Sequence, residues 1–124
     1  MPTRATVLVV DGDEMIHRQA QEQFNRLGFQ LHHADDAFQA LDLLAGNPGI
    51  ALLVIDVALR GTDGLQLAEM ARGIKPDVGL IMTSAAPWTG PSDLPHLRKP
   101  WQVLELETLV GRVLAGIWKP EDAS

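Results

Sequence analysis

The stretch VLVVDGDEM, residues 7–15, runs four aliphatic residues directly into a short acidic segment. An unbroken run of branched residues is typical of a strand that is buried on both faces of a parallel sheet. The predicted strands are TVLVV at 6–10, FQLHH at 29–33, ALLVI at 51–55, VGLIM at 78–82 and HLR at 96–98. The second and the fifth carry the weaker pattern. The sequence therefore predicts a sheet of five strands.

Between these strands, apolar residues recur at the spacing of amphipathic helices. They are Ile16, Ala20, Phe24 and Leu27, then Ala37, Ala40, Leu41 and Leu44, then Leu67, Ala68 and Ala71, and finally Val103, Leu106, Val110, Val113 and Leu114. Strands that alternate with helices predict an α/β fold with a doubly wound parallel sheet. The segment 85–98 breaks the alternation because it holds three prolines, so the fourth helix is expected to be short or missing.

The composition limits what the chain can be. Its 124 residues, 46% hydrophobic and 21% charged, have the size of one domain; we expect a single domain over 1–124, with a core at about 5–117 and a frayed tail at 118–124. A net charge of -6 disfavours direct binding to nucleic acid or to an anionic membrane. Cysteine is absent, which excludes disulfides and zinc–thiolate sites. No apolar run is long enough for a signal peptide or a membrane span, so a soluble cytoplasmic protein is expected.

Chemically reactive side chains follow the predicted strands. They are Asp11 and Asp13 after the first strand, Asp56 at the end of the third, Thr83 and Ser84 at the end of the fourth, and Lys99 after the fifth. Because ligand sites in open α/β sheets lie beyond the carboxyl ends of the strands, these side chains should converge on one edge. A carboxylate attacks a phosphoanion poorly unless a divalent cation and an ammonium neutralise the oxygens. This set of residues can supply the nucleophile, the ammonium and the cation ligands.

Four motifs occur in order at the strand ends: VLVVDGDE, LLVIDVALRGTDGL, LIMTSA and LRKPW. Together they resemble the receiver domain of bacterial two-component response regulators, over about residues 6–115. The resemblance implies a flavodoxin-like sheet with strand order 2-1-3-4-5. It also implies a phosphoprotein of two-component or phosphorelay signal transduction, a signalling module rather than an enzyme. Its partner would be a histidine kinase or a histidine phosphotransfer protein.

The resemblance assigns roles to individual residues. Asp56 is implied as the phosphoacceptor, Lys99 as the lysine that contacts the phosphoryl group, and Ser84 as the switch hydroxyl. His96 stands three positions before the lysine, where an aromatic side chain usually accompanies the switch. In this family the bond between the lysine and the following proline, here Pro100, is usually cis.

The magnesium site implied by the resemblance is incomplete. Asp11, Asp56 and the backbone carbonyl of Ala58 match metal ligands of the family. Gly12 falls where a second metal-coordinating acid normally stands, so magnesium binding is expected to be weak. Asp13 either caps the helix that follows it or replaces the missing ligand, and we favour the cap.

Each assignment has a structural alternative. Asp56 could be only a turn residue, and Lys99 could be a solvated loop lysine. Ser84 is preferred to its neighbour Thr83 from the register of the motif, since adjacent strand residues point to opposite faces. The other three histidines, His17, His32 and His33, are expected to be surface or edge residues rather than ligands.

Two further departures leave a second function open. Arg60 stands where the family usually has proline, and the shortened segment 85–98 belongs to the surface that normally carries the output. Dimerisation through that surface is therefore doubtful, and a monomer or weak dimer is expected. Together with Gly12, these departures fit a pseudo-receiver, a protein-interaction module that works independently of phosphorylation. An unrelated enzyme is a more distant alternative, because DGDE is too acidic to hold a nucleotide phosphate.

Overall fold

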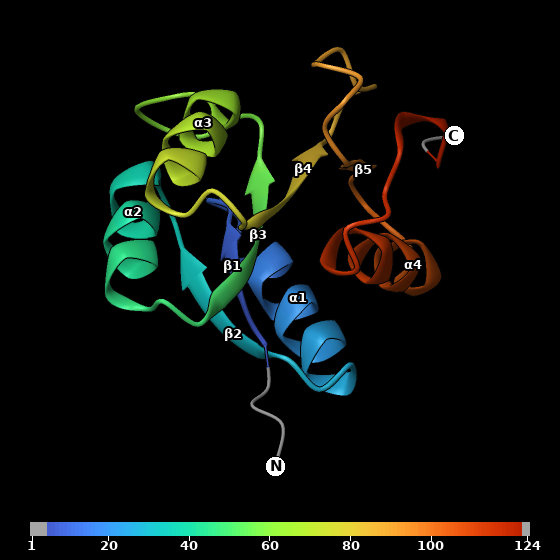
Figure 1. Cartoon of the computed structure of the whole chain (residues 1–124), viewed down its shortest axis with the longest axis horizontal. Helices are drawn as coiled ribbons and strands as arrows, with labels where there is room; N and C mark the ends of the chain where they lie inside the picture. Colours follow the sequence, from blue (N-terminus) through green and yellow to red (C-terminus); the bar gives the residue numbers. More distant parts are fainter. Residues whose placement is uncertain (1–4, 123–124) are drawn as a thin grey trace.

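The structure is a computed structural model that describes residues 5–122. Five parallel strands form one sheet in the order β2-β1-β3-β4-β5 (Figure 1). The strands are β1 (Thr6–Val10), β2 (Gln30–Ala34), β3 (Ile50–Asp56), β4 (Gly79–Ser84) and β5 (His96–Arg98). This confirms the predicted doubly wound fold and its strand order 2-1-3-4-5.

Four α-helices cover the two faces of the sheet (Figure 1). They are α1 (Glu14–Arg26), α2 (Ala37–Gly46), α3 (Gly64–Ile74) and α4 (Val103–Leu114). Side chains alternate between the faces of a strand, so Leu8 and Val10 pack with α2 and α3, whereas Val7 and Val9 pack with α1 and α4. The strands of the centre are thus buried on both faces, which explains their unbroken apolar sequences.

Three of the helices begin with an aspartate cap close to a strand end. The side chains of Asp13, Asp36 and Asp63 accept hydrogen bonds from backbone N–H groups of the first turns of α1, α2 and α3, at 2.9, 2.9 and 2.7 Å. A carboxylate in this position satisfies an otherwise unpaired donor and favours the positive end of the helix dipole. The caps therefore stabilise the first residue positions of α1, α2 and α3.

The helix expected between the fourth and fifth strands is missing. Residues 85–95, all of them described by the structure, form turns and bends instead. The prolines explain this, because each removes a backbone donor and disfavours helical geometry in the residue before it. Leu94 is 7% exposed and anchors the segment in the core, and the short strand β5 follows. The prediction of a short or missing fourth helix is confirmed.

The end of the chain folds back beside α4. Gly116 ends the helix with a φ of 71°, and Pro120–Asp122 form one turn of 3-10 helix. Arg112 Nη1 lies 3.5 Å from Asp122 Oδ2. This contact ties the segment predicted to be frayed to α4, although 123 and 124 lie outside the described residues. Within residues 5–122, no helix is both long and apolar enough to cross a membrane.

Candidate functional site

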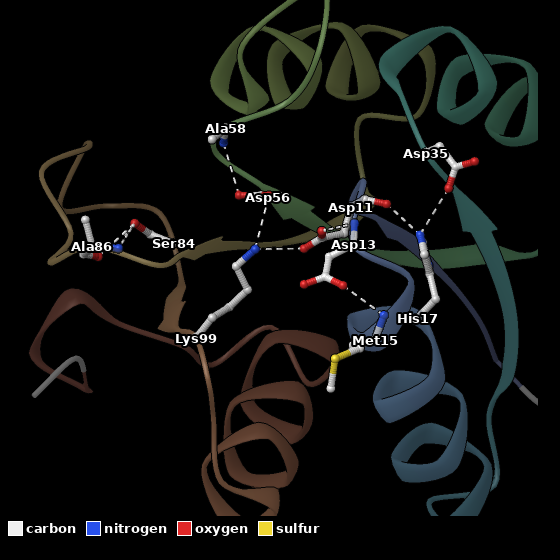
Figure 2. A network of polar contacts seen from close by, with 10 residues as sticks. All are labelled: Asp11, Asp13, Met15, His17, Asp35, Asp56, Ala58, Ser84, Ala86 and Lys99. Carbon is white, nitrogen blue, oxygen red and sulfur yellow. Dashed lines mark hydrogen bonds and ion pairs between the residues drawn. The ribbon is translucent and has the colours of Figure 1, made fainter.

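Three charged residues from separate strands meet at the carboxyl edge of the sheet (Figure 2). Lys99 Nζ lies 2.9 Å from Asp11 Oδ2 and 3.1 Å from Asp56 Oδ2. The side chains are largely buried, with 13% of Lys99, 3% of Asp11 and 12% of Asp56 exposed. Asp11 follows β1, Asp56 ends β3 and Lys99 follows β5, so the fold joins three of the six residues that the sequence predicts at one edge.

Backbone donors hold the second oxygen of each carboxylate. The N–H of Asp13 donates to Asp11 Oδ1 at 2.8 Å, and the N–H of Ala58 donates to Asp56 Oδ1 at 3.1 Å. In the described part of the chain, no buried side-chain nitrogen or oxygen lacks a hydrogen-bond partner. Both carboxylates are therefore oriented before any ligand arrives.

The lysine in this cluster is held in its charged form. Burial alone would lower the pKa of Lys99, but hydrogen bonds to Asp11 and Asp56, together with their negative charges, raise it above its ordinary value. Two carboxylates and one ammonium leave the cluster with a single negative charge. That charge favours a cation, and carboxylate oxygens are ligands that magnesium prefers.

Neither position 12 nor position 13 supplies a third carboxylate beside Asp11 and Asp56. The side chain of Asp13 accepts from the N–H of Met15 at 2.9 Å, as the capping hypothesis predicts. No group of three or more His, Cys, Asp or Glu side chains within residues 5–122 is arranged to hold a metal. Asp11 and Asp56 nevertheless share one cationic partner, Lys99, whose ammonium contacts an oxygen of each.

The backbone does not require glycine at position 12. Gly12 has no positive φ, and a Cβ built there would meet only the backbone oxygen of Asp35, at 4.0 Å. A side chain therefore has room at this position. The consequence of Gly12 is the missing carboxylate, not a special backbone conformation.

The hydroxyl of Ser84 is directed to its own loop. Its Oγ donates to the carbonyl of Ala86 at 2.8 Å and accepts from the N–H of Ala86 at 3.2 Å (Figure 2). His96 stacks on Trp88, with ring centroids 4.8 Å apart and an interplanar angle of 8°. No hydrogen bond joins Ser84 or His96 to Asp56 among the described residues. The structure thus places the two expected switch residues beside the site, not in it. The Lys99–Pro100 bond is cis, as expected.

One histidine was wrongly predicted to lie at the surface or an edge. His17 is buried, its Nε2–H donates to the backbone carbonyl of Asp11, and its Nδ1 lies 2.7 Å from Nδ1 of His33. Burial and the neighbouring His17 lower the pKa of His33. The signal was present in the sequence, because His17 shares its helix face with Ala20 and Phe24. A search for helical periodicity that counts only apolar residues misses a buried histidine on the same face.

A doubly wound sheet with carboxylates and a lysine meeting at its carboxyl edge defines a class of signalling protein, the two-component receivers. Residues 7–88 match the family model described as "Response regulator receiver domain". The chain belongs to this family, and the resemblance seen in its four motifs is confirmed. It is a receiver domain of two-component signalling, a class of signalling modules whose acidic pocket generally binds Mg²⁺ and whose partners are histidine kinases or phosphotransfer proteins.

Named relatives support this assignment. The response regulator MprA of Mycobacterium tuberculosis is 30% identical over an alignment 127 positions long, gaps included. The alignment covers 95% of this chain and 54% of MprA. The chain spans about half the length of the curated relatives it matches. The signal receiver domain of an HD domain-containing protein from Pseudomonas fluorescens Pf-5 superposes with a TM-score of 0.84 at 28% identity, covering 93% of this chain and 98% of that domain. A CheY-like receiver from Methanospirillum hungatei JF-1, with a TM-score of 0.81 at 20% identity, covers 98% of this chain and 100% of its own and supports the fold alone.

Proposed function

We propose that this receiver domain accepts a phosphoryl group onto Asp56 from a histidine kinase or a histidine phosphotransfer protein. The observation that carries the proposal is the position of Lys99 Nζ, 3.1 Å from Asp56 Oδ2 and 2.9 Å from Asp11 Oδ2. An ammonium at this place can neutralise a phosphoryl oxygen while the adjacent carboxylate attacks.

In this reaction, a carboxylate oxygen of Asp56 forms a bond to phosphorus while the bond from phosphorus to the donor's imidazole nitrogen breaks. The donor histidine keeps the electron pair of that bond and takes up a proton. Lys99 can then exchange one of its carboxylate contacts for a phosphoryl oxygen. Because Lys99 is already held between two carboxylates, the exchange needs little movement of its side chain.

The residues present fit a magnesium ion with reduced affinity. Asp11, Asp56 and the backbone carbonyl of Ala58 would hold it, and Asp13 would stay in its capping position. When bound, the ion supplies positive charge that neutralises the phosphoryl oxygens. The absence of an acid at Gly12 removes one ligand oxygen and one negative charge, which weakens binding.

Ser84 would act as the switch hydroxyl. After phosphorylation it would leave Ala86 and donate to a phosphoryl oxygen. Since Ala86 and Trp88 lie on the same connection, this change would reach the stack of Trp88 on His96. The domain would thereby pass the state of Asp56 to its surface.

The proposal also covers the extent, location, assembly and partners of the domain. We propose one receiver domain over 1–124 that acts in the cytoplasm as a monomer or weak dimer. Its net charge of -6 opposes direct binding to nucleic acid. The output target is a protein.

A pseudo-receiver is the second candidate, favoured by Gly12 and by the absence of a helix over 85–95. Incubation with acetyl phosphate and magnesium, followed by intact-mass measurement, separates the two. The first candidate requires one added phosphoryl group on the wild type and none on Asp56→Asn. Equal labelling of both proteins would remove Asp56 as the acceptor, and no labelling of either would favour the pseudo-receiver.

A further inference from the structure

The missing helix leaves a groove beside the edge strand β5. The groove has a volume of about 580 Å³ and is bounded by the start of the 85–95 connection, by β5, by α4 and by the C-terminal segment. Figure 1 shows the elements that bound it: the connection after β4, β5, α4 and the segment that follows α4. Binding pockets for small molecules have volumes of this order, about 300–1,000 Å³.

Aromatic side chains from three segments line the groove. Trp88 comes from the connection, His96 from β5 and Trp118 from the C-terminal segment. Trp88 is fixed by its stack on His96 and by the hydrogen bond from its Nε1–H to the carbonyl of Pro91, at 3.1 Å. All three side chains are half-buried, so they present ring surface to the groove without being sealed in the core. Such surfaces favour a ligand with a planar aromatic ring.

The charged side chains of the groove balance in number, and one cation among them has no ion-pair partner in the described part of the chain. The lining includes two arginines and two acids. Arg112 is paired with Asp122, and Glu105 accepts the backbone N–H of Gln102 in the capping box of α4. Arg98 is exposed and makes no ion pair within residues 5–122. Its guanidinium is therefore the cation in the lining that an incoming anion can engage without displacing an ion pair.

The shape favours a small molecule over an added peptide strand. β5 is three residues long, so its free edge offers few hydrogen bonds to a strand that would extend the sheet. The C-terminal segment also bounds the groove, because Trp118 and Asp122 belong to its lining. We propose that this groove binds a small planar aromatic anion, with its ring against the aromatic side chains and its charge at Arg98.

Ser84, the proposed switch residue, also lines this groove, so a bound ligand can affect the switch directly. The bond of Ser84 to Ala86 lies at the groove, and Ala86 is itself a lining residue. If Asp56 phosphorylation moves this hydroxyl, ligand and phosphoryl group act on the same side chain, and the factor by which phosphorylation changes the affinity for the ligand is the factor by which the ligand shifts the phosphorylation equilibrium. This coupling rests on the proposed function, whereas the binding site does not.

Binding is tested by calorimetric titration of the unphosphorylated chain with 2-naphthoate. Two matched probes separate ring from charge: 2-naphthylmethanol keeps the ring without the charge, and cyclohexanecarboxylate keeps the charge without the aromatic ring. We expect saturable one-to-one binding of 2-naphthoate that is about tenfold tighter than binding of either probe. Arg98→Gln should lower the affinity to that for the alcohol, and Trp118→Ala should weaken binding by a similar factor. Phe38→Ala and Arg26→Gln, exposed residues on other helices, are the controls.

Nuclear magnetic resonance of the three indole N–H groups locates the ligand. Signals of Trp88 and Trp118 should shift on addition of 2-naphthoate. The signal of Trp101 should not, because that side chain is buried and its Nε1–H donates to Gln23 at 2.7 Å. No saturable binding to the wild type, or wild-type affinity in both Arg98→Gln and Trp118→Ala, would overturn the site and leave this face to protein docking.

The coupling is tested by repeating the titration after phosphorylation with acetyl phosphate. We expect the affinity for 2-naphthoate to change by about fivefold or more. Full labelling of Asp56 with unchanged affinity would overturn the coupling alone. A chain that binds 2-naphthoate but cannot be labelled would overturn the proposed function and the coupling, while the binding site would stand.

Discussion

Lys99 Nζ and Asp11 Oδ2 lie 2.9 Å apart, although 88 positions separate the two residues in the sequence. Asp11 follows the inner strand β1 and Lys99 follows the edge strand β5, so the ion pair reaches across the carboxyl ends of β3 and β4. Asp56 joins it from β3, at 3.1 Å from the same ammonium. The cluster therefore depends on the order of the strands. Its two carboxylates share one ammonium as counter-charge.

Removal of the ammonium should destabilise the fold. Lys99→Met leaves two largely buried carboxylates without their shared counter-charge. We expect the free energy of unfolding to fall by about 2 kcal/mol, below the roughly 3–5 kcal/mol for a fully buried pair because the site opens to solvent. Urea denaturation at neutral pH measures this. Lys119→Met, at an exposed lysine, is the control, and equal stability of both variants would contradict the account of the cluster.

The same variant gives a prediction for alkaline pH. The pKa of Lys99 is raised in the folded state, so its contribution to stability is fully present below the ordinary lysine pKa of 10.5 and is lost as pH rises through the raised value. The difference in unfolding free energy between wild type and Lys99→Met should shrink in this range. Urea denaturation at stepped pH values above 9 would follow it, and a difference that grows with pH would contradict the raised pKa.

The stability of the fold at acidic pH should depend on the pair of His17 and His33. The pKa of His33 is lowered by burial and by His17, so the folded state resists protonation. Its contribution to stability is present above the ordinary value of 6.5 and is lost as pH falls through the lowered value. His33→Asn should flatten the pH dependence of thermal stability below pH 6.5. An unchanged profile in His33→Asn would show that other groups cause the loss.

Much of the fold could be predicted from the sequence because its signals are local. Unbroken aliphatic runs predicted the central strands, and three prolines predicted the missing helix. The position of Asp13 before an amphipathic stretch predicted its cap. The convergence of Asp11, Asp56 and Lys99 followed from one rule about strand ends, once the alternation of strands and helices was recognised.

Other features depend on three-dimensional packing. The buried ring of His17 is satisfied by the ring of His33, 16 positions away, and by the carbonyl of Asp11, six positions away, and neither contact can be read from the helical pattern. The bond of Ser84 to Ala86 depends on the loop conformation that replaces the helix. Trp118 lies in a segment with the sequence of a polar tail, yet it lines one groove with β5, and Asp122 of the same segment contacts Arg112.

Asp13 should matter for stability more than for magnesium. Its carboxylate accepts from Met15 N–H at 2.9 Å, so Asp13→Ala should cost about 1 kcal/mol of unfolding free energy through loss of the cap. Asp36→Ala, which removes the equivalent cap of α2, should cost a similar amount. Magnesium titrations followed by nuclear magnetic resonance should give equal affinities for both variants. A selective loss of magnesium binding in Asp13→Ala would identify Asp13 as the replacement ligand.

Restoring an acid at position 12 should strengthen magnesium binding. The Cβ of a new side chain would meet only the oxygen of Asp35, at 4.0 Å, and Gly12 has no positive φ, so Gly12→Asp fits without strain. The added carboxylate contributes a ligand oxygen and a negative charge at a partly solvated site. We expect an affinity gain of about tenfold, because one charge in such a position is worth about 1 kcal/mol or somewhat more.

The gain should require the site and not merely a more acidic protein. Gly49→Asp adds the same charge before β3, at the opposite edge of the sheet, where a Cβ meets nothing within 4 Å. Magnesium titrations of the wild type, Gly12→Asp and Gly49→Asp, followed by nuclear magnetic resonance, compare the three affinities directly. If Gly12→Asp binds no more tightly than Gly49→Asp, then Asp11 and Asp56 already set the affinity, and the glycine does not weaken the magnesium site.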